Sequence, residues 1–194
     1  GDTVATLVSL TLTPLKIERI ERIHPKMDRL DVIGHAIIFN SGMAVKLPED
    51  MNQGVALATL DVCGAPAQTA HLVSEGMNVA IIGGGGKSGL LCLYEAKRRA
   101  GKKGRVVALD YSDANCEQLR KLPFVDQVIQ GDARQASATS QAIRAALGGE
   151  GADVCINVAN VPGTEMSSIL ATKENGTVYF FSMATSFSAA ALGA

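Results

Sequence analysis

Four consecutive glycines, Gly83 to Gly86, follow a short apolar run and precede a segment with helical periodicity. Together with a later glycine they contain a G-x-G-x-x-G spacing, at Gly84, Gly86 and Gly89. In that spacing the first glycine makes a tight turn, the second lets the backbone approach a pyrophosphate, and the third allows close packing of helix on strand. The N-terminus of the following helix attracts the same anion. The pattern therefore predicts a phosphate-binding turn.

A second spacing fits the same turn, because Gly83, Gly86 and Gly89 are also spaced three residues apart. The sequence thus leaves open whether Gly83 or Gly84 makes the tight turn. A flexible glycine linker is disfavoured, since linkers are not bracketed by a buried strand and an apolar-faced helix.

The residues that start the helix can add to phosphate binding, because an ammonium or a hydroxyl there donates to the anion. A P-loop lysine is excluded for Lys87, since that motif would need a glycine where Ile81 stands. The candidate phosphate contacts are consecutive in the sequence: Gly84, Gly85, Gly86, Lys87, Ser88 and Gly89.

An acid ends the next predicted strand, Arg105 to Asp110. Asp110 lies 21 residues after Gly89, where a dinucleotide-binding fold places the carboxylate that binds the adenosine ribose. Such a carboxylate favours NAD over NADP, because it accepts hydrogen bonds from the ribose diol and repels a 2′-phosphate. The following residues, Tyr111 and Ser112, supply no arginine to neutralise that phosphate.

Polar residues also follow three later predicted strands, at Asp132, Asn157 and Ser182. Ligands in an open parallel sheet bind beyond the carboxyl ends of its strands, so these residues are further candidates for cofactor contacts. Asp132 either flanks an adenine or merely ends its strand.

No catalytic group stands out in the sequence. The three histidines, His24, His35 and His71, lie far apart and form no ligand pair at helical spacing, so no metal site is predicted. Cys63, before a helix, is the position to watch, although isolated cysteines are usually buried and inert.

The secondary structure that is expected to position these residues differs between the first part of the chain and the rest. Residues 1–50 are β-rich, with strands expected within Thr3 to Leu12, Leu30 to Phe39 and Ala44 to Leu47. Leu15 to His24 has apolar residues every third position, which is closer to a helical period, with a bulged surface strand as the alternative. The charged residues from His24 to Asp31 suggest a solvated loop.

Residues 51–76 are expected to be mostly helical, with a break at Gly64 to Pro66, and residues 77–194 alternate short strands with helices. Such alternation predicts an α/β fold with a Rossmann-type, doubly wound parallel sheet and right-handed crossovers. The final strand is expected at Thr177 to Phe181, after a turn at Asn175 and Gly176.

Composition excludes several classes of protein. The chain has 194 residues, 47% hydrophobic and 19% charged, with a net charge of −1, which gives no footprint for nucleic acid or an anionic membrane. The four scattered cysteines favour a reducing compartment and hence the cytoplasm. Because it opens without methionine and stops without a helix-ending signal, the sequence is expected to be a piece of a longer protein.

Several stretches resemble the medium-chain dehydrogenase/reductase superfamily and, within it, the 3,5-diaminohexanoate dehydrogenase family of lysine fermentation. The resemblance covers most of the chain. It is carried by GDTVATLVSLTLTPLKI (residues 1–17), LDVCGAPAQTA (60–70), VAIIGGGGKSGLL (79–91), NVPGTEM (160–166) and VYFFSMATSFSAAALGA (178–194).

The resemblance implies a β-rich, GroES-like catalytic part before an NAD-binding domain, and a cytoplasmic enzyme. Its substrate would be (3S,5S)-3,5-diaminohexanoate, a diamino acid whose C3 gives a hydride to NAD, with 5-amino-3-oxohexanoate and ammonium as products. Members of the family are longer, so this chain is expected to turn over little substrate by itself and to associate with other chains as a homo-oligomer. The zinc-dependent branch of the superfamily has a metal-ligand cysteine near the position of Cys63, but the remaining ligands would lie outside this sequence.

Two other classes of protein remain open. A SAM-dependent methyltransferase also uses a glycine-rich turn and acids after the second and third strands, which Asp110 and Asp132 match. Its fold has no place for the β-rich first part. A nucleotide-sensing module without catalysis is the other alternative.

Overall fold

A computed structural model describes residues 1–6, 14–27, 29–39, 42 and 44–182 of the chain. The chain divides into two compact units, Gly1–Ala58 and Thr59–Ala194, and each is described by itself. Parts of two expectations fall outside the described residues: the strand region beyond Thr6 and the resemblance stretch after Ser182.

The first unit is built from two antiparallel strand pairs. Strand β1 (Val4–Thr6) pairs with β4 (Ala44–Lys46), and β2 (Leu15–His24) pairs with β3 (Arg29–Ala36). The helical interpretation of residues 15–24 is therefore wrong, and the bulged strand is what forms. The pairing slips between Ile17 and Arg19 and again between Ile20 and Arg22, so one extra residue enters at each step.

These two bulges explain the apolar period of three in β2. A regular strand alternates its faces every second residue, and an extra residue between apolar positions returns the next one to the same face. Ile17, Ile20 and Ile23 thus lie on one side of the β2–β3 pair, and all three are exposed.

The prediction of a solvated loop from His24 to Asp31 is also wrong at both ends, because the terminal residues of that range belong to the two strands. Only a short 3₁₀ turn, η1 (Pro25–Met27), separates β2 from β3 in the described residues. Across it, His24 Nε2 lies 2.9 Å from Asp31 Oδ2, and Arg29 Nε donates to Asp31 Oδ1 at 2.8 Å.

Helix α1 (Gln53–Val62) spans the division between the units, and α2 (Gly64–Leu72) follows it after a single residue. The break predicted at Gly64 to Pro66 is the start of α2, where proline is tolerated because the first N–H groups have no helical partner.

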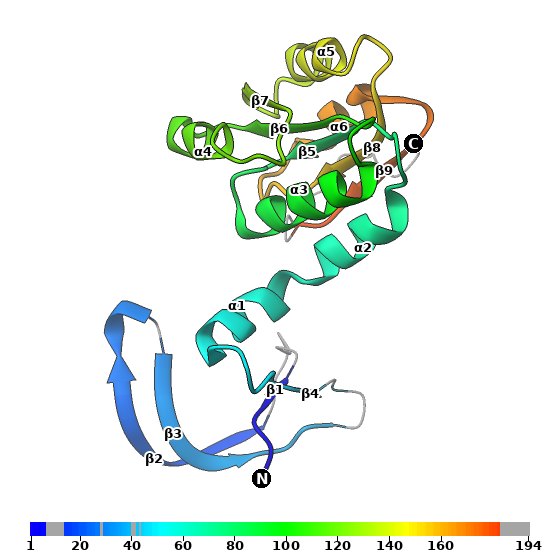
Figure 1. Ribbon diagram of the computed structural model, residues 1–194. Helices are drawn as coiled ribbons and strands as arrows, with labels where there is room; N and C mark the ends of the chain where they lie inside the picture. The colour runs from blue at the N-terminus through cyan, green and yellow to red at the C-terminus, as the bar shows by residue number, and fades with distance from the viewer. Residues whose placement is uncertain (7–13, 28, 40–41, 43, 183–194) are drawn as a thin grey trace. The chain divides into compact units, whose positions relative to one another are not determined.

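Five parallel strands form the sheet of the second unit (Figure 1). They are β5 (Val79–Ile82), β6 (Val106–Asp110), β7 (Gln127–Gln130), β8 (Ala152–Asn157) and β9 (Thr172–Phe180). Their order in the sheet is β7-β6-β5-β8-β9, so the chain starts in the middle and winds first to one edge and then to the other. This confirms the doubly wound sheet and sets the topological switch point at the end of β5.

Helices cover both faces of the sheet (Figure 1): α3 (Lys87–Ala100), α4 (Asp113–Leu119), α5 (Ala136–Ala146) and α6 (Glu165–Ala171). Alternate residues of each strand enter different cores. Val79 and Ile81 pack in the cluster that contains Leu93 of α3, whereas Ala80 and Ile82 pack in the cluster that contains Ile143 of α5. The three central strands, β5, β6 and β8, are largely apolar because both of their faces are buried.

The last strand begins earlier than the sequence suggests. Asn175 and Gly176, read as a turn before the strand, lie inside β9, where the pairing with β8 jumps from Ala152↔Thr172 to Val154↔Thr177. Asn175 has a φ of 59°, which a β-bulge accommodates and asparagine tolerates.

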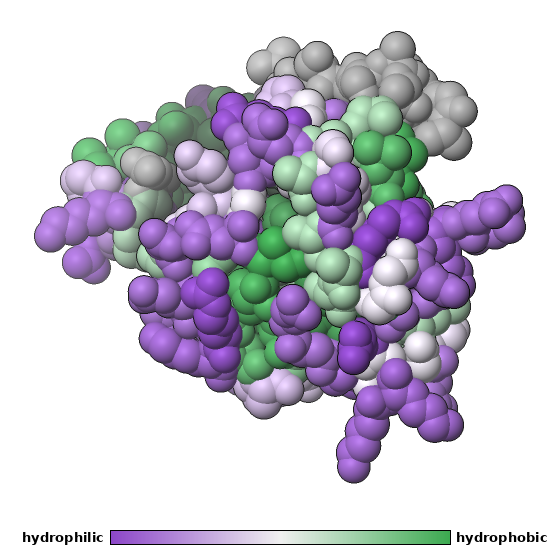
Figure 2. All heavy atoms as spheres, turned by 90° about the horizontal axis from the view of Figure 1, so that it is seen from above, coloured by the Kyte–Doolittle hydropathy of each residue, from purple (hydrophilic) through white to green (hydrophobic). Residues whose placement is uncertain are grey.

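Polar side chains cover most of the face seen in Figure 2, with an apolar strip between them. Within the described part of the chain, no helix is both long and apolar enough to cross a membrane.

Candidate nucleotide-binding site

The glycine turn leaves the end of β5 at the switch point of the sheet. Gly83 has a φ of +86°, and the backbone N–H groups of Gly83 and Gly84 both donate to the Leu109 carbonyl, at 2.9 and 3.0 Å. The left-handed conformation at Gly83 makes the tight turn, which settles the choice that the sequence left open. A Cβ at Gly89 would lie 2.3 Å from the Gly83 carbonyl oxygen, so helix α3 packs directly on the turn.

The first residues of α3 are those for which the sequence predicts an anion-binding helix end. Gly86 is the N-cap, is exposed, and has no side chain to accept from the first N–H groups of the helix. A Cβ on Gly86 would meet one atom within 4 Å, the Gly83 carbonyl oxygen at 3.6 Å. The Lys87 ammonium lies 3.5 Å from the Asp61 carboxylate, with both side chains about two-thirds exposed, and Ser88 is half-buried.

The Asp110 carboxylate lies at the end of β6 and is bound to the glycine turn. Its Oδ2 accepts from the Gly85 N–H at 2.8 Å, and its Oδ1 accepts from the Ser112 N–H at 3.0 Å and from Asn115 Nδ2 at 3.1 Å. Asp110 is 8% exposed. The carboxylate is thus held in one orientation beside the turn, as a ribose ligand must be.

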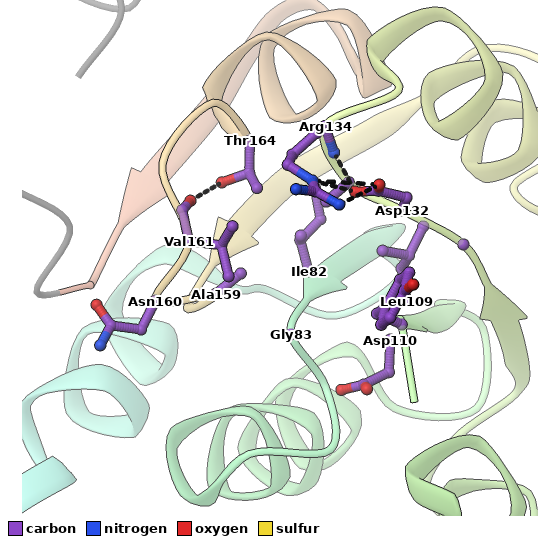
Figure 3. Close-up of a pocket in the computed structure, with 13 residues that line it drawn as sticks. Ile82, Gly83, Leu109, Asp110, Asp132, Arg134, Ala159, Asn160, Val161 and Thr164 are labelled. Atoms are coloured by element: carbon purple, nitrogen blue, oxygen red, sulfur yellow. Dashed lines mark hydrogen bonds and ion pairs between the residues drawn. The ribbon is translucent and has the colours of Figure 1, made fainter. Parts of the chain in front are cut away.

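A pocket of about 320 Å³ opens beside these residues, on the side of the sheet that carries α5 and α6. Figure 3 shows Ile82 and Gly83 between its two walls. One wall carries Asp132 and Arg134, and the other carries residues 159–161 and Thr164. Asp110, Leu109 and Tyr111 complete the side next to β6.

Arg134 is a pocket residue that sequence reasoning missed. Its Nε donates to Asp132 Oδ1 at 2.9 Å and its Nη2 donates to Asp132 Oδ2 at 2.7 Å, and the guanidinium lowers the pKa of the Asp132 carboxyl. The prediction considered only Tyr111 and Ser112 as neighbours of Asp110 and is therefore incomplete, because the loop after β7 brings an arginine into the pocket that Asp110 lines. The signal was an acid and an arginine two residues apart, directly after a strand.

Asn157 does not reach the pocket. It is 2% exposed, and its amide nitrogen donates to Thr164 Oγ1 at 2.9 Å and Ser168 Oγ at 3.0 Å. Its Oδ1 accepts from the Ala159 N–H at 3.1 Å. The side chain therefore shapes the loop that forms one wall instead of facing a ligand. Ser182 is half-buried after β9 and is not among the residues that line the pocket.

The thiols of the second unit are poor nucleophiles where they are buried. Burial raises the pKa of Cys92 to about 11 and that of Cys155 to about 12, so both stay protonated near neutral pH. Cys63 is half-buried at the N-cap of α2. Among the described residues, no group of three or more His, Cys, Asp or Glu side chains could hold a metal ion.

Solved structures share this fold at low sequence identity. Alcohol dehydrogenase TADH from Thermus sp. ATN1 superimposes with a TM-score of 0.60 and 21% identity, over 77% of this chain and 44% of the other. The complex of mycobacterial Rv1454c with NADPH gives a TM-score of 0.58 and 22% identity, over 74% and 43%. The fold is that of the medium-chain dehydrogenases/reductases.

The closer similarity is to one family of these enzymes. Residues 1–48 match the model of the L-erythro-3,5-diaminohexanoate dehydrogenase N-terminal domain. Over its whole length the chain is 53% identical to L-erythro-3,5-diaminohexanoate dehydrogenase of Acetoanaerobium sticklandii and 49% identical to that of Fusobacterium nucleatum. It spans 56% of the length of each relative. The resemblance found in the sequence is thereby confirmed.

Proposed function

We propose that this chain supplies the NAD-binding part of an enzyme that oxidises the C3 amine of (3S,5S)-3,5-diaminohexanoate to a ketone with release of ammonium. The observation that carries the proposal is the identity of 53% and 49% along the entire chain with two proteins of that name. The matched region covers all 194 residues and so includes the glycine turn and the strand ends, where the candidate site residues lie.

The residues of the site fit a dinucleotide. The open space above Gly86 and the first N–H groups of α3 suit a pyrophosphate, since a Cβ at Gly86 would narrow the approach to the helix end. The Asp110 carboxylate beside the turn suits the ribose hydroxyls, and the pocket lined by Leu109, Tyr111 and Val161 suits the flat, largely apolar adenine.

In this arrangement the chain binds and orients while the nicotinamide, when bound, supplies the hydride acceptor. The α3 N-terminus would hold the pyrophosphate, and Asp110 would hold the adenosine ribose. Together they would set the position of the nicotinamide end, because two fixed points along the dinucleotide define its direction across the sheet.

We further propose a preference for NAD over NADP. A 2′-phosphate on the ribose would face the Asp110 carboxylate with like charge. Arg134 is not free to neutralise the 2′-phosphate, because its guanidinium is already paired with Asp132. The lost hydrogen bonds and the repulsion should amount to roughly 2–4 kcal/mol, a preference of about 30- to 1,000-fold.

Calorimetric titration of the chain with NAD, NADP and SAM tests the proposal. We expect NAD to bind most tightly, and we expect Asp110→Asn to remove most of the difference between NAD and NADP while keeping the volume of the side chain. Asp113→Asn is the matched control, because it removes an exposed acid three residues along and should leave the ratio unchanged. Equal affinities for NAD and NADP in the unmodified chain would refute the assignment of Asp110.

The same titration separates the other classes of protein. Binding of SAM in preference to NAD would support a methyltransferase. The similarity to dehydrogenases argues against that outcome. Binding of NAD by the full-length protein without turnover of 3,5-diaminohexanoate would support a sensor. We also propose a cytoplasmic location, supported by four cysteines that are all free thiols.

A further inference from the structure

We propose that Asn115 is a positioning residue of the ribose site, and that residue 85 is glycine because the Asn115 side chain occupies the space a Cβ would need. The inference rests on the proposed binding of NAD. It concerns a residue of α4 that has no recognisable place in the glycine motif.

The contact between the turn and α4 is unusually close. A Cβ at Gly85 would lie 2.5 Å from Asn115 Cβ, 2.6 Å from its Cγ and 2.6 Å from its Nδ2. Gly85 does not have a left-handed φ, so its backbone conformation is open to any residue. The requirement for glycine at this position is therefore one of space, and the neighbour that takes the space is Asn115.

The Asn115 side chain is also hydrogen-bonded to the Asp110 carboxylate. Asn115 Nδ2 donates to Asp110 Oδ1 at 3.1 Å, while the Gly85 N–H donates to Asp110 Oδ2 at 2.8 Å. Gly85, Asn115 and Asp110 thus form a closed set of contacts that joins the turn, the end of β6 and the start of α4. Asn115 itself is held in the first turn of α4, where its N–H donates to Ser112 Oγ at 3.4 Å.

This set fixes the direction of the Asp110 carboxylate before any ligand arrives. A carboxylate offers about four lone-pair sites, and Gly85, Ser112 and Asn115 use three of them. The free site is on Oδ2, the oxygen next to the glycine turn. An amide is a suitable donor for this purpose, because it orients the acid without neutralising the charge that disfavours a 2′-phosphate.

The first test measures the steric contact in the cofactor-free chain. Gly85→Ala should lower the melting temperature by about 4 °C or more, because its Cβ collides with Asn115. Asn115→Gly removes the Asn115 Cβ, Cγ and Nδ2 atoms that the new Cβ would meet. The double variant should therefore lose less melting temperature than the two single variants lose together. Gly86→Ala is the matched control, since its Cβ has room, and it should show neither the loss nor the rescue. Additive shifts in the double variant would overturn the steric part of the inference.

The second test measures the positioning role by titration with NAD, NADP and ADP-ribose. Asn115→Asp keeps the size of the side chain but puts an acceptor of like charge against Asp110. We expect it to weaken NAD and ADP-ribose binding about 10-fold or more, and Asn115→Ala to weaken them less. The ratio is read from Asn115→Ala, which adds no charge near the 2′-phosphate: NADP, which cannot use the carboxylate in the same way, should change less than NAD in this variant, so the NAD-to-NADP ratio should fall.

A purely structural role for Asn115 would weaken NAD and NADP binding equally, and that result would overturn the positioning role. An unmodified chain that binds neither NAD nor ADP-ribose would refute the proposed function and the positioning role with it. The melting experiment would still decide whether Asn115 dictates the glycine, because it uses no cofactor.

Discussion

The glycines of the turn have different neighbours, so glycine is required at each position for a different reason. Gly83 provides the left-handed turn, Gly85 leaves room for Asn115, and Gly89 packs on the Gly83 carbonyl. Gly86 alone of these faces open space at the end of α3. Three of these glycines therefore meet requirements of the fold, and Gly86 is the one that we propose leaves room for the ligand.

Gly86 and Gly89 should respond differently to substitution. We expect Gly86→Val to keep a melting temperature within about 2 °C of the unmodified chain, while NAD binding falls about 100-fold or more because branched carbon blocks the pyrophosphate. Gly89→Ala should instead lower the melting temperature by several degrees, since its Cβ would meet Gly83 and Gly84 backbone atoms at 2.3–2.7 Å. Near-normal NAD affinity in Gly86→Val would mean that the phosphate binds elsewhere.

Asp132 should influence cofactor selectivity by occupying Arg134. Asp132→Asn keeps the shape of the side chain but leaves the guanidinium on the pocket wall without its counter-charge. We expect NADP to gain roughly 2- to 5-fold relative to NAD, the range for an exposed ion pair. Arg134→Ala removes the cation and serves as the control, with no gain for NADP. An unchanged ratio in Asp132→Asn would show that Arg134 does not reach the ribose phosphate position.

At the scale of elements, the Asp153 carboxylate links three strands near their amino ends, at the opposite end of the sheet from the candidate site. It lies in β8, its Oδ2 accepts from the Asn78 N–H just before β5 at 2.7 Å, and its carboxylate pairs with Lys173 of β9. Burial opposes ionisation, but the bonds from Lys173 and Asn78 outweigh it, so the pKa of Asp153 is lower than 3.8 in the folded chain.

This lowered pKa predicts how stability depends on pH. Because the folded-state pKa lies below the unfolded one, the contribution is complete above about pH 4–5 and is lost as pH falls through the folded value. Asp153→Asn should therefore cost about 1–3 kcal/mol of unfolding free energy at pH 7 and much less near pH 2. Denaturant titrations at both values check this, with the exposed Glu174→Gln as control. An equal cost at both values would mean that the ionised carboxylate is not what stabilises the strands.

At the scale of the molecule, the candidate nucleotide contacts all belong to the second unit, Thr59–Ala194. A chain that starts at Asn52 keeps α1 whole, since Asn52 Oδ1 accepts from the Gly54 N–H at 2.9 Å and the Val55 N–H at 3.3 Å. We expect this shorter chain to fold and to bind NAD within about 3-fold of the 194-residue chain. Circular dichroism and calorimetry measure both properties, and the same chain carrying Asp110→Asn is the control. A loss of more than about 10-fold would show that the first unit contributes to the site.

The sequence alone determined the features that depend on neighbouring residues. The apolar runs Val79–Ile82 and Val106–Asp110 are strands buried on both faces, which a short uninterrupted apolar pattern indicates. The glycine turn and Asp110 follow from their distance along the chain, because one helix of ordinary length separates β5 from β6. The doubly wound sheet was predictable for the same reason.

Only the tertiary structure decided the features that depend on residues distant in the sequence. Two bulges against β3 turn the period of three in β2 into one face of a strand, and no local pattern distinguishes that from a helix. Asn157 bonds inward to Thr164 and Ser168 although it ends a strand as a ligand residue would. Arg134 enters the pocket from a different loop, and Asn115 dictates the glycine at position 85 from a different helix. In each case the deciding contact is made across space by a side chain whose partner the chain brings close only after folding.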